Sequence, residues 1–234
     1  MSRRTPLAKS SERPPRPTPP TQEFGAVSDS SMLRQYPVAH YERRPLEFYP
    51  AKPERICGDI LEIGPGRGDF LMSEARTHPE QRFVAVEVGL RRFAKLAARA
   101  EKHGLSNVLV IGGDARLVIP RHFDAASFGS VVVLFPDPWP KRRHAFNRLL
   151  QPEFLVELAR ILQPGGHLYL KSDVESYIVW VGEQIARLPQ YRVVEDRWPW
   201  GQVGTEDGRT LSLFADRQTG LGYDIHSLCL ERLP

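Results

Sequence analysis

A glycine-rich loop beside a carboxylate is the first group of residues in this chain whose types and spacing suggest chemistry. Glu62 is followed by Gly64, Gly66 and Gly68 within the segment EIGPGRG. Glycines allow tight turning and let the backbone approach a ligand closely. A carboxylate beside such a loop attracts an amine or another cation and repels a pyrophosphate. The loop therefore favours a ligand that carries positive charge, although this spacing also occurs in dinucleotide folds and in ordinary turns.

Two further acids follow the next two apolar runs of the chain. Glu87 ends the run after the loop and can accept hydrogen bonds from both hydroxyls of a ribose, while Asp114 follows the third run and can accept from an adenine amino group. The dinucleotide fingerprint fails, because Asp69 stands where its third glycine would be. Each acid alone is more often a solvated charge at a strand end. Together with the loop, however, the three acids favour S-adenosylmethionine, which carries an amine and a sulfonium and no phosphate.

A proline-framed acid lies further along the chain, in the segment FPDPWPKRRH that begins at Phe135. The three prolines fix φ at their own positions and should hold Phe135, Asp137 and Trp139 in extended conformations. This arrangement predicts a stiff loop that presents an acid and an aromatic ring, and it makes a purely structural role for Asp137 the less favoured alternative.

Basic residues gather directly after this loop and indicate contacts with phosphates. The cluster comprises Lys141, Arg142, Arg143, His144 and Arg148. The alternative is a solvated start of a helix. Trp139 could stack on a base. A second acid, Asp173, follows a later apolar run, where it could bind substrate, cap the next helix, or do both.

The elements needed to position these residues alternate between strand and helix, which predicts an α/β fold. We expect strands at 59–63, 83–88, 108–111, 130–135, 167–171, 191–197 and 225–231, and helices at 69–76, 90–103, 152–162 and 174–188. The pattern predicts a doubly wound, mostly parallel, seven-stranded sheet. The last two strands have no helix clearly between them and could pair antiparallel. Ligands of such sheets bind beyond the carboxyl ends of the strands.

Composition and charge place limits on the organisation of the chain. The net charge of the 234 residues is +4, all of it from residues 1–22, which contain six prolines and read as a disordered basic tail. We expect residues 23–56 to form an extension that packs on or near the site, and residues 57–234 to form the catalytic domain. Two distant cysteines fit a reducing, cytoplasmic compartment, and we expect neither a metal site nor a membrane segment.

The quoted motifs resemble those of the bacterial tRNA (guanine-N7)-methyltransferase family. The matching stretches are LEIGPGRGDF, AVEVGLRRF, GGDAR, FPDPWPKRRHAFNRLLQ and KSDVESY, in the order of the family and within residues 58–188. The resemblance implies that Glu62, Glu87 and Asp114 contact S-adenosylmethionine. It also implies that Asp137 lies at the cofactor and catalytic centre, and that Lys141 and Asp173 contact a guanosine in the variable loop of tRNA.

The C-terminal part departs from the pattern of this family. Where the family has a Thr-x-Phe-Glu element that helps to hold guanine, this chain has Ser212-Leu213-Phe214-Ala215. Ser212 keeps the hydroxyl, whereas Ala215 removes the carboxylate. Methylation of another RNA position or of a small molecule is therefore a competing hypothesis, as is a non-catalytic RNA-binding paralogue. A dinucleotide-dependent oxidoreductase is a third.

Overall fold

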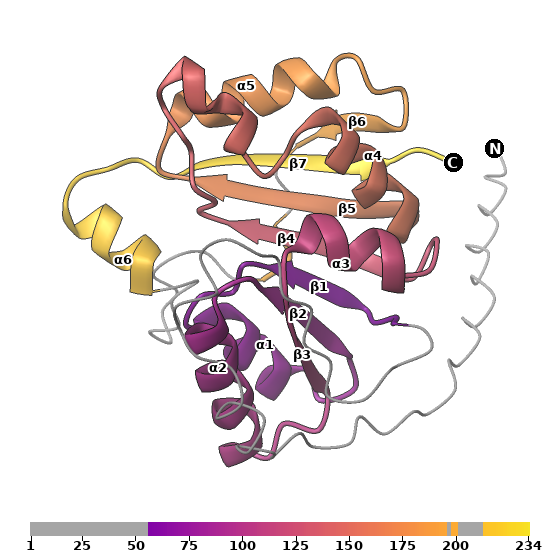
Figure 1. Cartoon of the computed structure of the whole chain (residues 1–234), viewed down its shortest axis with the longest axis vertical. Helices are drawn as coiled ribbons and strands as arrows, with labels where there is room; N and C mark the ends of the chain where they lie inside the picture. Colours follow the sequence, from indigo (N-terminus) through magenta and orange to yellow (C-terminus); the bar gives the residue numbers. More distant parts are fainter. Residues whose placement is uncertain (1–55, 196–197, 201–212) are drawn as a thin grey trace, which may run out of the picture.

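The computed structural model describes residues 56–195, 198–200 and 213–234. The predicted tail (1–22) and all but the last residue of the predicted extension (23–56) lie outside the described residues. Within them, strands and helices alternate around one sheet (Figure 1). Its strands are β1 (Ile60–Ile63), β2 (Phe83–Glu87), β3 (Val108–Gly112), β4 (Phe128–Leu134), β5 (Leu162–Ser172), β6 (Tyr191–Val194) and β7 (His226–Arg232).

The sheet has seven strands in the order β3-β2-β1-β4-β5-β7-β6. The first five strands are parallel, and β7 pairs antiparallel with both β5 and β6. The predicted fold class, including the antiparallel last strands, is confirmed. Because β1 pairs with β2 on one side and β4 on the other, the strand order reverses between β1 and β4. This reversal is where a doubly wound sheet opens a crevice for ligands.

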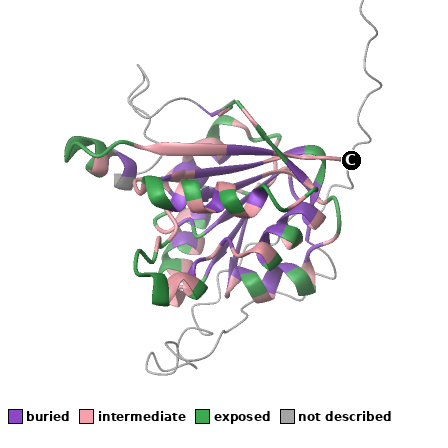
Figure 2. Cartoon of the chain, turned by 90° about the horizontal axis from the view of Figure 1, so that it is seen from above, coloured by how far each residue is buried: buried purple, intermediate pink, exposed green. Residues whose placement is uncertain are grey.

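Helices cover both faces of the sheet. They are α1 (Asp69–Thr77), α2 (Leu90–Lys102), α3 (Ala115–His122), α4 (Pro152–Ile161), α5 (Glu175–Ile185) and α6 (Leu213–Gly220), with a 3₁₀ helix η3 at Arg142–Asn147. Successive strand residues point to opposite faces and so divide between two cores. One core contains Val131 and Val133 with side chains of α3, α4 and α5, and the other contains Val132 with side chains of α1 and α2. Figure 2 shows these strands buried between helices whose outer sides are exposed.

Two short helices were not predicted, for recognisable reasons. Helix α3 has only eight residues and contains Pro120, which weakens its helical pattern. The expectation of no helix between the last two strands is wrong, because α6 lies there, directly before β7. Its eight residues carry no marked apolar stripe. By contrast, the predicted long helix forms as α2 because Leu96 and Ala100 recur on one buried face. None of the described helices is long and apolar enough to cross a membrane.

Candidate active site

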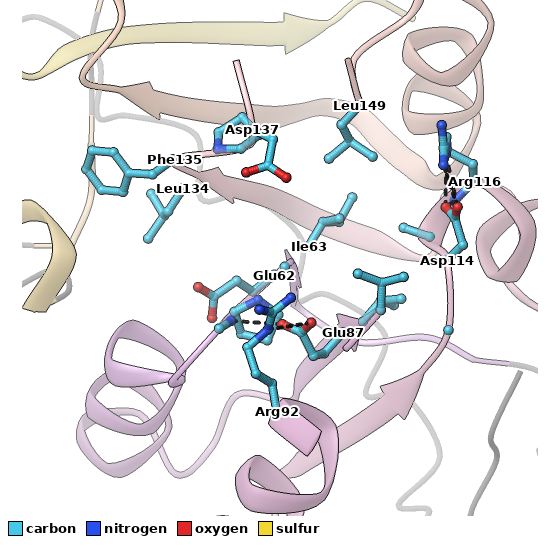
Figure 3. Close-up of a pocket in the computed structure, with 18 of the residues that line it drawn as sticks. Glu62, Ile63, Glu87, Arg92, Asp114, Arg116, Leu134, Phe135, Asp137 and Leu149 are labelled. Atoms are coloured by element: carbon cyan, nitrogen blue, oxygen red, sulfur yellow. Dashed lines mark hydrogen bonds and ion pairs between the residues drawn. The ribbon is translucent and has the colours of Figure 1, made fainter. Parts of the chain in front are cut away.

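A cavity of about 540 Å³ opens at the carboxyl ends of β1 to β4, where the strand order reverses. Its walls include residues at or just beyond the carboxyl ends of four different strands. They are Glu62, Gly64 and Gly66 from the end of β1, Glu87 from β2, Asp114 after β3, and Phe135, Asp137 and Trp139 after β4. The structure therefore brings together the acids that the sequence placed far apart (Figure 3). Gly68, Lys141, Arg142, Arg143 and Asp173 do not line this cavity.

The three glycines of the loop have different surroundings. Gly64 and Gly66 have φ values of 72° and 58°, and a Cβ at either position would meet no atom within 4 Å. This backbone leaves open space for a ligand. Gly68 also has positive φ, but a Cβ there would lie 2.1 Å from Leu96 Cδ1. Gly68 lets α1 begin in close contact with α2, and its role in binding the cofactor stays a prediction.

Glu62 is one of two acids at the cavity that are almost completely buried, the other being Glu87. Glu62 is 2% exposed, and its Oε2 has no hydrogen-bond partner among the described residues. Burial, together with the charges of Asp69 and Glu87, raises the pKa of Glu62 to about 8, although a hydrogen bond from the Leu71 backbone opposes this rise. A cationic ligand beside Glu62 would compensate the buried charge. The group therefore fits the amine that the sequence led us to expect.

Glu87 is held in one orientation by three donors. Its Oε2 accepts from the Gly66 N–H at 3.1 Å, and its Oε1 accepts from the Gly89 N–H at 2.7 Å and from Arg92 Nε at 3.0 Å. Carboxylate oxygens offer about four acceptor positions in all, so capacity remains for a ribose hydroxyl. The contact with Gly66 also fixes the glycine loop against β2.

Asp114 caps helix α3 and pairs with an arginine on its first turn. Its Oδ1 accepts from the Arg116 N–H at 2.9 Å, and its Oδ2 lies 2.6 Å from the Arg116 guanidinium. Burial tends to raise the pKa of Asp114, but the hydrogen bonds and charge of Arg116 outweigh it and lower the pKa. Arg116 also lines the cavity, so Asp114 and Arg116 meet a ligand as an ion pair.

The backbone of the loop after β4 is not extended at every residue for which we predicted it. Phe135 and Trp139 have φ values of 50° and 40°, in the left-handed region, so the expectation is wrong for these two residues. The Phe135 N–H donates to the Lys171 carbonyl at 2.8 Å and continues the pairing of β4 with β5. Beyond this bond the Asp137 side chain faces the cavity, as Figure 3 shows. Such backbone strain costs about 1–3 kcal/mol for each residue and is typical of functional sites.

The basic residues after this loop divide into two environments. Lys141, Arg142 and Arg143 are exposed on or just before η3, and none forms an ion pair within the described ranges. Arg148, predicted to belong to the same cluster, is only 9% exposed. Its guanidinium donates to the carbonyls of Pro138 and Trp139, so it is part of the scaffold and does not face solvent.

Asp173 follows β5 and contacts helix α6. Its predicted role as a helix cap is wrong, because the Ser172 hydroxyl accepts from the Val174 N–H, and Val174 is the N-cap of α5. Asp173 Oδ2 accepts instead from Gln218 Nε2. Ala215, on the same helix as Gln218, is fully buried, and Ser212 lies outside the described residues.

Several residues of the site were missed by sequence reasoning. Arg92 and Arg116 line the cavity and bind its acids, while Arg99 Nη1 donates to the Arg67 carbonyl and to Asp69 beside the glycine loop. The positions of the predicted acids could have indicated these arginines. An acid that is buried near a strand end needs a hydrogen-bond donor, and the following helix is the nearest element that can supply one. No group of three metal-ligating side chains occurs in the part of the chain that the structure describes.

Comparisons with known proteins agree with this architecture. A family model described as "Putative methyltransferase" matches residues 58–227. A tRNA (guanine-N(7)-)-methyltransferase of Nitrosomonas europaea is 42% identical over 151 residues, which cover 63% of this chain and 65% of the relative. A protein of the same name from Bordetella pertussis is 36% identical over 192 residues, 82% of this chain and 74% of the relative. The crystal structure of a methyltransferase from Pyrococcus furiosus matches with a TM-score of 0.53 and 21% identity over 78% of each chain.

The strand order and the acid-lined crevice define the class I methyltransferase fold. Within that class, the sequence matches are specific enough to assign a family. The chain belongs to the tRNA (guanine-N7)-methyltransferase family. In three of the curated relatives, the aligned segment spans only 50% to 65% of the relative's own length.

Proposed function

We propose that the protein transfers a methyl group from S-adenosylmethionine to N7 of a guanosine in tRNA. The observation that carries this proposal is the meeting of two sets of groups at the sheet crevice. Buried acids line one side of the cavity, and Asp137 lies opposite them at the start of an exposed basic segment. The names of the relatives and the FPDPWPKRRH motif support the same substrate.

The cavity fits S-adenosylmethionine by the character of its polar groups. Glu62, with its unpartnered buried oxygen, would hold the amine, and the open backbone of Gly64 and Gly66 would lie against the ligand. Glu87 would accept from the ribose, and Asp114 would accept from the adenine. S-adenosylmethionine supplies an electrophilic methyl group when bound.

The residues of this chain then have two tasks in the reaction. Guanine N7 carries a free lone pair, so no general base is needed to expose it. Alkylation makes the purine cationic, and the Asp137 carboxylate, fixed at the cavity, would stabilise that charge as it develops. The remaining task is to hold N7 in line with the methyl group, which converts an encounter into an intramolecular step.

The substrate is proposed to be held by residues around the basic segment. Lys141, Arg142 and Arg143 would bind phosphates, a contribution independent of sequence and sensitive to salt. Asp173 and Ser212 would contact the guanosine, with Asp173 accepting from guanine N1–H and the 2-amino group, which adenine cannot offer in that pattern. Trp139, 37% exposed at the cavity rim, would stack on a base.

The proposal is tested by transfer of a labelled methyl group to defined acceptors. We expect label to enter bulk tRNA that lacks modifications, and not free guanosine or ribosomal RNA. Transfer only to another RNA or to a small molecule would replace the proposed substrate. Such a replacement has one observation in its favour, the buried Ala215 where the family has a carboxylate.

Calorimetric titrations test whether the protein is a methyltransferase at all. A non-catalytic RNA-binding paralogue would fail to bind S-adenosylmethionine, and a dinucleotide-dependent oxidoreductase would bind NAD. We expect binding of S-adenosylmethionine and none of NAD, because the unpartnered oxygen of Glu62 fits an amine and the chain lacks the third glycine of the dinucleotide fingerprint.

A further inference from the structure

Arg148 lies underneath the loop that carries Asp137. Its Nε donates to the Pro138 carbonyl at 3.0 Å, and its Nη2 donates to the Trp139 carbonyl at 3.3 Å. These two carbonyls directly follow Asp137 in the chain. With 9% exposure, the guanidinium is not available to a phosphate in the way that the exposed Arg142 and Arg143 are.

The loop needs such a donor because of its own sequence. Pro136, Pro138 and Pro140 have no backbone N–H, so the segment cannot form a regular ladder of hydrogen bonds. Trp139 also has φ of 40°, a conformation that persists only where the surroundings impose it. A planar guanidinium presents several donors in fixed directions and can bind two carbonyls at once.

The guanidinium is itself fixed from the opposite side. It lies 4.5 Å from the centroid of the Trp180 ring and 5.9 Å from that of Tyr177, both on α5. Gln151 Nε2 donates to the Ala145 carbonyl at 2.6 Å and so ties the start of α4 to η3 next to Arg148. Arg148 therefore links the loop after β4 to the helix that follows β5.

We propose that Arg148 is a positioning residue, which sets the place of Asp137 in the crevice by fixing the backbone of residues 138 and 139. The inference rests on the proposed function of Asp137. It assigns Arg148 to the chemical step, in contrast to its basic neighbours, which act on tRNA binding.

The kinetic test compares Arg148→Lys and Arg148→Met with Arg142→Met. Lysine keeps the positive charge but loses the planar guanidinium that donates to two carbonyls at once. Methionine loses the charge and keeps an apolar side chain over Trp180. For both Arg148 variants we expect kcat to fall by about 10- to 100-fold, because small displacements of a reacting group are costly, while the KM for tRNA and its salt dependence stay close to wild type. The Arg142 variant should instead raise the KM for tRNA and lower its salt dependence.

A second readout does not depend on activity. Hydrogen exchange should become faster in both Arg148 variants at the Phe135 amide, which donates to the Lys171 carbonyl at the start of the loop, and remain as in wild type in the Arg142 variant. Melting temperatures show whether a variant has lost its fold. If the Arg148→Met protein is unfolded, the test relies on the Arg148→Lys protein, which carries the milder change. If Arg148 variants lose tRNA affinity and salt dependence with normal loop exchange, the inference is overturned. If the wild-type protein modifies no guanosine N7 but the exchange result holds, the proposed function fails and the positioning of the loop stands.

Discussion

The two sides of the crevice hold their functional groups in different ways. At the ends of β1, β2 and β3, the acids are largely buried, and Glu87 and Asp114 are held by arginines from the following helices. At the end of β4, Asp137 is exposed on a strained loop, and Lys141, Arg142 and Arg143 after it are exposed as well. The first side suits a small ligand of constant shape. The second suits a large polyanion that approaches from solvent and leaves again.

Because of this difference, substitutions at the end of β4 should affect catalysis, and substitutions at the ends of β1 to β3 should affect cofactor binding. The largest effect is expected for Asp137→Asn. The variant keeps the size of the side chain but removes the charge that would stabilise the cationic purine. We expect turnover to fall by about 100- to 1,000-fold with the fold intact. Single-turnover methyl transfer and thermal melting measure the two properties. Glu183→Gln, at an exposed position on α5, is the matched control, and near-wild-type turnover of the Asp137 variant would sink the assignment.

Glu62→Gln should act on the opposite side of the crevice. The amide removes the buried charge that would pair with the cofactor amine, so the affinity for S-adenosylmethionine should drop by about 10- to 100-fold. Calorimetric titration measures this affinity. The affinity for tRNA in the absence of cofactor should not change, and a variant that loses tRNA binding and keeps cofactor binding would contradict the division into two sides.

The glycine loop offers a comparison within the cofactor side. Gly68→Ala places a methyl group against Leu96 at a positive φ, so we expect the free energy of unfolding to fall by about 1–3 kcal/mol. Gly104→Ala is the control, because Gly104 also has positive φ but open space around it. Denaturant titrations of both proteins should rank Gly68→Ala as clearly less stable. Equal losses would mean that backbone strain alone is measured.

The smallest expected effect is a pH dependence on the cofactor side. Glu62 has a pKa of about 8 in the folded protein and an ordinary value of 4.5, so the folded state binds more protons between these values. The stability that its protonated form contributes is complete below pH 4.5 and is lost as pH rises through 8. Without cofactor, Glu62→Gln should therefore gain in stability relative to wild type as pH rises. Melts at several pH values check this, and a constant difference would show that the carboxyl titrates normally.

Sequence reasoning predicted the sheet and the cofactor side better than the substrate side, for physical reasons. Parallel strands buried on both faces, such as Val131–Val133, leave continuous apolar runs, and an acid at the end of each run marks the crevice. The burial of a charged side chain leaves no comparable pattern in the sequence. Arg148 therefore looked like its neighbours, and Phe135 and Trp139 looked extended although tertiary contacts hold them in the left-handed region. Helix α6 was missed because its eight residues show little periodicity.

In the proposed function the two sides act together, and a cofactor bound by buried acids is used on a guanosine presented by an exposed basic segment. The most direct test of this function is nucleoside mapping by mass spectrometry after incubation of the protein with S-adenosylmethionine and unmodified tRNA. We expect 7-methylguanosine from the variable loop, formed by the wild-type protein and not by Asp137→Asn. A different methylated nucleoside, or 7-methylguanosine formed equally well by the Asp137 variant, would contradict it.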